Sequence, residues 1–423
     1  MIVNHRYIFF TLLAPWLFVF SLRAMGPIRY EDISELFLLF LLCFIFFTLL
    51  GYIIGASRLN SQTRIKTILK KNQHGENIRR EIDIVTILTL LYVTLAHIDF
   101  FFLKGGTLST ITIVRESDNI TGSRMSILGG VISVASAAPF ILLCMLKHQR
   151  VLSNQSESKF KLTLALGGIA TSFLSGGRNG FLIGMVIYFF HGFLLKKFYA
   201  DKKYNKKNRN DYTAKFFICA GILFSFFLFS SRELNQGIDS NQLLSFFAIK
   251  WNVRIDEYNT NNIFFEVVYA TVTIFIFYLT HALNFIDQYT IDNFSPILMG
   301  AYNFPVPSKI IDVLFSTTIS SNVSNELLVP GVYLTLPGSL YVDLGYFGTI
   351  FAGFLGGIIT GLANKIPTRK IFLQLQLLSF MTCTWVLAPL YFTIGISNGF
   401  SFIVIMIFLL IRSIIKKRKL YYD

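Results

Sequence analysis

The feature that most constrains this chain is a series of long apolar stretches separated by segments rich in Lys and Arg. Several of the apolar stretches approach or exceed 20 residues, which is the length that an α-helix needs to cross the hydrocarbon core of a bilayer. Hydrophobic residues make up 53% of the 423 residues and charged residues only 14%. The sequence therefore predicts an all-α polytopic membrane protein rather than a water-soluble domain.

The Lys/Arg-rich segments set the expected orientation, because short basic loops stay in the cytoplasm. With every such segment placed inside, the chain crosses the membrane ten times and both termini are cytoplasmic. The first span is expected to be an uncleaved anchor, since Leu22, Arg23 and Ala24 make a poor cleavage site. The expected spans are residues 7–22, 33–54, 82–103, 127–146, two within 162–195, 216–231, 337–362, 371–390 and 398–415.

The charge and the cysteines exclude several function classes. The net charge of +15 comes from the basic cytoplasmic segments, so it does not indicate nucleic-acid binding. The four cysteines fall within apolar stretches and form neither a disulfide framework nor a metal cluster. No Walker or dinucleotide motif is present, so we expect no nucleotide and no other cofactor.

The charge rule also divides the chain into three parts: membrane helices over residues 1–231, one large outside loop over 232–336, and further membrane helices over 337–423. Within the loop, residues 243–251 have the spacing of an amphipathic surface helix that ends at Trp251. Residues 263–283 are long and apolar enough to span. Either they pack against the bundle without crossing, which we favour, or a second crossing follows and the total is twelve.

The hairpin within residues 162–195 has a polar tip, Ser-Gly-Gly-Arg-Asn-Gly, at residues 175–180. Two full crossings need about 40 apolar residues. The hairpin is shorter than that, so its tip is expected to sink into the outer leaflet. Arg178 would then be a cation at the edge of the hydrocarbon, where such residues are typically functional. The alternative is a plain turn whose arginine reaches the lipid headgroups.

Arginine outnumbers lysine among the basic residues expected outside. Arginine grips paired phosphate oxygens better than lysine does, because its planar guanidinium presents a fork of donors. Arg178, Arg232 and Arg254 are the candidates for a phosphate clamp. Arg23, Arg29 and Arg124 are expected to make ordinary headgroup contacts.

The candidate general bases are few. His281 shares a helical face with Asn284, and Asp287 follows about two turns later. A histidine beside a membrane-embedded cavity can take a proton, although a lone histidine on an apolar helix is more often a packing residue. Asp343 is a third candidate, with helix capping or pairing with Arg178 as its alternative roles.

Three glycines recur at four-residue spacing near the end of the chain, at positions 353, 357 and 361. Small residues at this spacing let two membrane helices approach closely. The pattern predicts close helix packing rather than chemistry.

Several of these features together resemble a known family. They are the hairpin tipped by Gly-Gly-Arg-Asn-Gly, the single large outside loop, the stretch Tyr-x-x-His-x-x-Asn-Phe-x-Asp within it, and the sequence Gly-Ser-Leu-Tyr-Val-Asp-Leu-Gly-Tyr-Phe-Gly at residues 338–348. The chain is similar in these respects to bacterial oligosaccharide repeat-unit polymerases, the O-antigen polymerases of the Wzy type, and to the related O-antigen ligases. The likeness covers residues 162–362 with motifs and the rest by topology.

The resemblance implies a GT-C-like glycosyltransferase at the periplasmic face of the bacterial inner membrane. It implies that a glycan on undecaprenyl pyrophosphate is transferred to the terminal sugar of a new lipid-linked repeat unit, without metal or nucleotide. In this reading Arg178, Arg232 and Arg254 bind the leaving pyrophosphate, and His281, Asp287 or Asp343 takes the acceptor proton. The partners are lipid-linked oligosaccharides and membrane lipid, and a chain-length regulator is left open as a further one.

One departure from the family pattern and two rival functions accompany this interpretation. The family's loop repeats place a glycine after an arginine at a spacing that the outside arginines here lack. An O-antigen ligase would have the same fold and nearly the same site. A flippase for lipid-linked oligosaccharides, or another secondary transporter, would be expected to show two related halves, and the sequence shows none.

Overall fold

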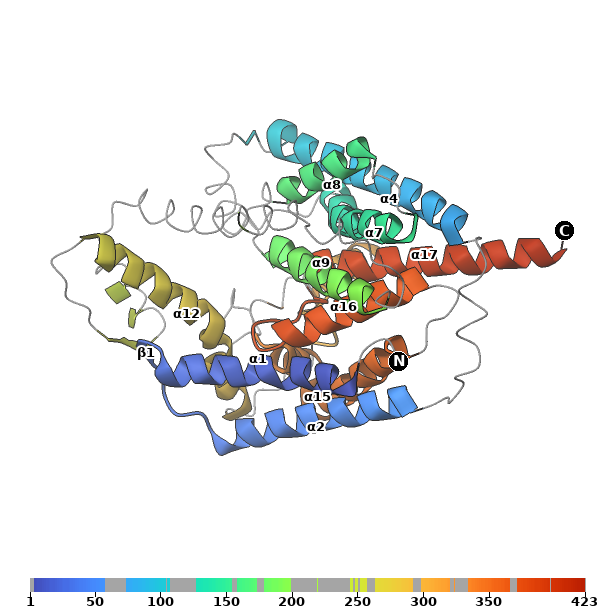
Figure 1. Ribbon diagram of the computed structural model, residues 1–423. Helices are drawn as coiled ribbons and strands as arrows, with labels where there is room; N and C mark the ends of the chain where they lie inside the picture. The colour runs from blue at the N-terminus through green and yellow to red at the C-terminus, as the bar shows by residue number, and fades with distance from the viewer. Residues whose placement is uncertain are drawn as a thin grey trace.

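The computed structural model describes residues 4–57, 74–103, 105–106, 127–153, 158–172, 179–198, 219, 244–245, 248–249, 252–256, 263–291, 298–319, 323, 334–365, 371–395 and 397–422. The predictions made for Arg178, for Arg124 and Arg232, for Trp251 and for nearly all of the span at 216–231 lie outside these residues. The described residues form helices and one two-stranded ribbon (Figure 1).

The helices follow the apolar stretches. They are α1 (His5–Met25), α2 (Glu35–Ser57), α4 (His74–His97) with its π-helical continuation η2 (Ile98–Leu103), α6 (Ile127–Ala135), α7 (Ala138–Ser153), α8 (Lys159–Thr171), α9 (Asn179–Phe198), α12 (Ile263–Ile291), α13 (Pro305–Phe315), α15 (Leu336–Ala363), α16 (Ile371–Leu387) and α17 (Ser397–Tyr422). The strands β1 (Ile28–Arg29) and β2 (Arg254–Ile255) pair in antiparallel fashion.

Seven helices in the described part of the chain are long and apolar enough to cross a membrane. They cover His5–Met25, Glu35–Ser57, Ile78–Leu103, Val131–Val151, Gly180–Lys197, Val268–Asp287 and Leu336–Ala363. Two shorter apolar helices cover Ile371–Leu387 and Gly399–Arg412. The fold is thus that of an all-α polytopic membrane protein, while the total of ten spans stays a prediction.

Helices α2 and α15 run side by side and touch through glycines (Figure 1). A Cβ atom on Gly357 would lie 2.1 Å from the carbonyl oxygen of Thr48, and one on Gly51 would lie 2.1 Å from that of Phe354. Neither contact leaves room for a side chain, because both neighbours are backbone atoms. The prediction of close packing from the glycines at 353, 357 and 361 is confirmed, and the partner surface on α2 carries Gly51 and Gly55.

Helix α15 is broken at Gly345, whose φ of 66° lies outside the helical region. The break releases backbone carbonyls that an unbroken helix would use internally. The carbonyl oxygens of Val342 and Asp343 instead accept the backbone N–H groups of Leu298 and Met299. A loop before α13 is therefore fastened to the break in α15.

Helix α12 packs where α1 ends and α2 begins. Its Ile276 approaches Gly26, and its Asp287 contacts Ser34. The eleven positions between these two α12 residues cover about 16 Å of helix, so α12 lies along the α1–α2 connection rather than along either helix. Figure 1 shows α12 at the end of the bundle where β1 lies, and both chain termini at the opposite end. We call the end with β1, β2 and α12 the ribbon end.

Candidate functional site

The β1–β2 ribbon brings two arginines together. Its register pairs Ile28 with Ile255 and Arg29 with Arg254. Ile28 and Ile255 pack with Val253 and with Phe277 of α12. The two arginines therefore occupy the exposed face of the ribbon. Side chains directly opposite each other in an antiparallel pair have Cβ atoms about 5 Å apart. The side chains of Arg29 and Arg254 therefore start from neighbouring positions on this face of the ribbon.

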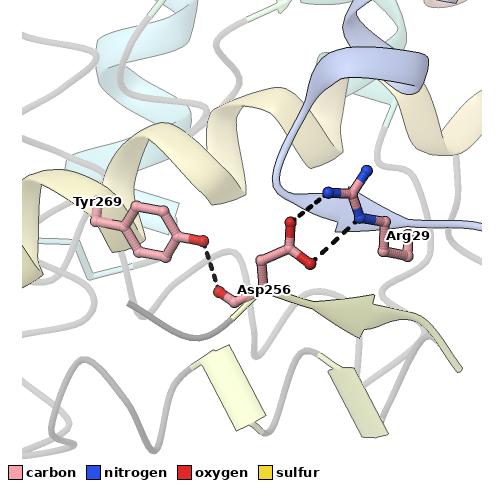
Figure 2. Close-up of polar contacts among 3 residues, drawn as sticks. All are labelled: Arg29, Asp256 and Tyr269. Carbon is pink, nitrogen blue, oxygen red and sulfur yellow. Dashed lines mark hydrogen bonds and ion pairs between the residues drawn. The ribbon is translucent and has the colours of Figure 1, made fainter. Parts of the chain in front are cut away.

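Arg29 is oriented by an acid, whereas no described acid orients Arg254. The Nε and Nη2 atoms of Arg29 donate to the two carboxylate oxygens of Asp256, at 3.2 and 2.7 Å (Figure 2). The hydroxyl of Tyr269 on α12 donates to the carbonyl oxygen of Asp256 at 2.6 Å and holds that residue in place. Among the described residues, the side chain of Arg254 has no acidic partner. Within the part of the chain that the structure describes, the pair therefore has one positive charge without an acidic partner.

A second arginine environment lies at the end of α1. The guanidinium carbon of Arg23 stands 4.5 Å from the centre of the Tyr30 ring, as in a cation–π contact. Its Nη2 donates to the carbonyl oxygen of Glu31. Its Nη1 is buried and makes no hydrogen bond to any described residue. Arg23 therefore has protein partners but also a donor group that they leave unsatisfied.

Tyr30 links this environment to α12. The hydroxyl of Thr280 donates to the carbonyl oxygen of Ile276 at 2.8 Å, so the Tyr30 hydroxyl is the donor in its 2.7 Å contact with the Thr280 oxygen. Burial raises the pKa of Tyr30 to about 12. The phenol is therefore protonated at neutral pH and donates a hydrogen bond to Thr280.

Asp287 docks α12 on the first residues of α2. Its carboxylate accepts the backbone N–H of Ser34, at 3.1 Å to the nearer oxygen, and the Ser34 hydroxyl. The Ser34 oxygen also accepts the backbone N–H of Phe37 at 3.2 Å, as an N-cap does. A carboxylate is favourable at this position because the N-terminus of a helix carries partial positive charge. Arg23 lies close enough for its charge to interact with Asp287 as well.

His281 sits in an aromatic cluster on α12. Its ring stacks on Phe277 with centres 4.9 Å apart and meets Tyr278 and Phe285 edge-on. Its Nδ1 is 2.9 Å from the carbonyl oxygen of Phe277. Six positions along a helix rotate a side chain by about 120° from the starting face, so His281 and Asp287 point in different directions. The structure does not bring these two candidates together.

Asp343 is the third candidate, and its contacts are those of an anchor. Its carboxylate, 1% exposed, accepts the backbone N–H groups of Tyr302 and Asn303 at 3.1 and 2.9 Å. It also accepts the side-chain amide of Asn303 at 2.6 Å. These bonds hold the loop before α13, and the catalytic role suggested for Asp343 stays a prediction.

Sequence reasoning missed the contribution of β1. The sequence predicts lipid-headgroup contacts for Arg29 and Arg23, whereas the structure gives each of them protein partners. The signal that was available is the short segment Pro-Ile-Arg-Tyr at residues 27–30, in which a proline and a β-branched residue favour extended backbone. Nothing in that segment indicates that it pairs with the strand that contains residue 254.

The arrangement suits a phosphate better than a metal. The guanidinium of Arg254, and the N–H groups of Arg29 that Asp256 does not accept, can donate to phosphate oxygens. In the described part of the chain, no three His, Cys, Asp or Glu side chains are grouped to hold a metal ion. Comparison with protein-family models, with curated proteins and with solved structures found no match.

Proposed function

We propose that this chain is a membrane glycosyltransferase that polymerises oligosaccharide repeat units carried on undecaprenyl pyrophosphate. The observation that carries the proposal is the pair formed by Arg29 and Arg254 on the exposed face of the ribbon. The sequence resemblance to O-antigen polymerases supplies the chemistry. The proposed fold is GT-C-like, with the ribbon end at the periplasmic face of the inner membrane and both termini in the cytoplasm.

In the proposed reaction, the hydroxyl of the acceptor sugar attacks the anomeric carbon of the donor glycan. The bond between that carbon and the pyrophosphate oxygen breaks, and the leaving undecaprenyl pyrophosphate takes the electron pair. Arg29 and Arg254 neutralise the charge that develops on its oxygens, together with Arg178 and Arg232. This step requires hydrogen-bond donors that are already oriented. The hydrogen bond that Arg29 donates to Asp256 holds the Arg29 guanidinium in a fixed orientation.

A side chain must accept the proton of the attacking hydroxyl. Of the three candidates, Asp287 is the one that contacts Ser34 and lies within electrostatic reach of Arg23. We assign the role of general base to Asp287. His281 and Asp343 remain in the proposal as the alternatives, with a packing role and an anchoring role respectively if Asp287 takes the proton.

The experiment compares surface polysaccharide from a gene deletion with that from the same strain complemented by wild-type or Arg254→Ala protein. A polymerase predicts a ladder that collapses to core plus one repeat in the deletion, returns with wild type and stays collapsed with the variant. Long polymer retained on the lipid carrier, with none on the core, would instead identify a ligase. Loss of every outward-facing repeat would identify a flippase.

A further inference from the structure

Helix α13 presents its apolar face outward. Four large apolar residues cover that face, and their exposed fractions are 54% for Ile310, 41% for Ile311, 69% for Leu314 and 72% for Phe315. Exposed apolar clusters of this kind mark interaction sites. We call these four residues the α13 apolar face.

Two polar residues of α13 make hydrogen bonds close to the helix itself. Ser308 is buried and its hydroxyl donates to the carbonyl oxygen of Phe304 at 2.9 Å. Asp312 accepts the Thr317 hydroxyl at 2.6 Å and the backbone N–H of Ile319 at 2.8 Å, which fixes the end of the helix. A helix in water would expose the polar face and bury the apolar one. The apolar residues of α13 are instead exposed, while Ser308 is buried.

The anchoring of α13 sets its depth. Asn303 is bonded to Asp343, which lies inside the candidate membrane helix Leu336–Ala363. Pro305, the first residue of α13, follows Asn303 by two positions, which extended chain spans in about 7 Å. Helix α13 therefore starts level with residues within a membrane helix rather than far out in water.

At that level the lipid-facing surface of α15 begins. Leu344, just after Asp343, opens a stripe of exposed apolar residues with three- and four-residue spacing, as expected of a helix side in contact with lipid. Met299, whose backbone N–H is bonded to the carbonyl oxygen of Asp343, is also exposed. The stripe consists of Leu344, Phe347, Phe351, Leu355, Ile359 and Leu362.

We propose that α13 is an interfacial helix whose apolar face inserts into the membrane leaflet at the ribbon end. The partner is bilayer lipid, because the face is apolar, turned away from the protein and attached where α15 becomes lipid-exposed. An amphipathic helix in this position lies in the membrane plane with its apolar side buried at the headgroup–acyl boundary. This inference does not depend on the proposed glycosyltransferase activity.

The test uses full-length protein in phosphatidylethanolamine–phosphatidylglycerol vesicles. The native cysteines are replaced, and Leu314→Cys and Phe315→Cys are each labelled with an environment-sensitive fluorophore. Both labels should be quenched by lipids with a spin label near the headgroup, whereas Phe351→Cys, further along the α15 stripe, should be quenched by lipids labelled deeper in the acyl chain. Asp32→Cys, exposed in the α1–α2 connection, should be quenched by aqueous iodide instead.

Two results would overturn the inference. Iodide quenching of both α13 labels, without quenching by spin-labelled lipid, would place the face in water. Self-quenching that depends on protein density, again without lipid quenching, would place it against a second copy. Using two neighbouring label sites guards against a variant that fails to insert, and lipid quenching at Phe351→Cys verifies insertion of the preparation.

Discussion

Arg29 and Arg254 are direct cross-strand partners, and of the two only Arg29 has an acidic partner among the described residues. The two hydrogen bonds to Asp256 fix the orientation of the Arg29 guanidinium. No described acid compensates the charge of Arg254. One oriented guanidinium beside one available guanidinium is a suitable arrangement for a group with several anionic oxygens.

The first prediction concerns this pair. Arg254→Lys should lower polymer formation by about 100-fold, nearly as much as Arg254→Ala, because a lysine keeps the charge but loses the paired donors. Polymer made from lipid-linked repeat units by purified protein measures the effect. Arg80→Ala, which removes an exposed arginine from α4, is the matched control and should be active. Wild-type activity in Arg254→Lys would leave the ribbon outside the site.

Variants at Asp287 and Ser34 can separate a catalytic role of Asp287 as the general base from a structural role in holding α12 against α2. In Asp287→Asn the side-chain oxygen still accepts the Ser34 N–H but takes no proton, so polymer formation should fall about 100- to 10,000-fold at an unchanged membrane level. Ser34→Ala removes the hydroxyl contact and the cap while sparing the carboxylate. That variant should lose about 1 kcal/mol of stability and keep its activity. Full activity in Asp287→Asn would reduce the residue to docking.

The helices and the close packing through the α15 glycines could be predicted from the sequence because their signals are local. A run of about 20 apolar residues predicts a membrane helix wherever it occurs, and glycines four apart define one helix face. The second half of that contact, on Gly51 and Gly55, was not predicted. Which helix a glycine face meets depends on the packing of the whole bundle.

The site was harder to predict because its contacts join distant parts of the chain. Arg29 and Asp256 are 227 positions apart, and a two-residue strand has too little periodicity to be recognised. Asp287 illustrates the same difficulty, since its contact with Ser34 spans 253 positions. The shared helix suggested His281 as its companion, but the helical rotation between them separates their directions.

The glycine contact gives a stability prediction. Gly357→Ala should lower the thermal unfolding midpoint in detergent, because the new methyl group meets the Thr48 carbonyl and the two helices must separate. Overpacking of this kind costs about 1–3 kcal/mol. Gly167→Ala on α8 is the control, since nothing lies within 4 Å of its added Cβ. It should leave the midpoint unchanged or raise it, as alanine favours a helix by up to about 1 kcal/mol. Equal midpoints for the two variants would contradict the close contact.

His281 should tolerate an aromatic replacement. His281→Phe keeps the flat ring among Phe277, Tyr278 and Phe285, so polymer formation and membrane level should stay within about twofold of wild type if packing is its role. His281→Ala leaves a cavity in that cluster and should reduce the membrane level. Loss of polymer in the phenylalanine variant, at a normal membrane level, would return the role of base to His281.

The last prediction concerns the sides of the membrane. Reporters active only in the periplasm should be active when fused after Asn241 or Ser308 and silent when fused after Lys206 or Lys370, because the basic segments remain in the cytoplasm. Helix α12 decides the outcome at Lys370. It is a candidate span by length and composition, yet its Thr280 and Asp287 bind the α1–α2 connection, and a helix docked there need not cross. An active fusion after Lys370 would show that α12 crosses the membrane alone. The ribbon end and the loops after α12 would then not lie on the membrane sides predicted here.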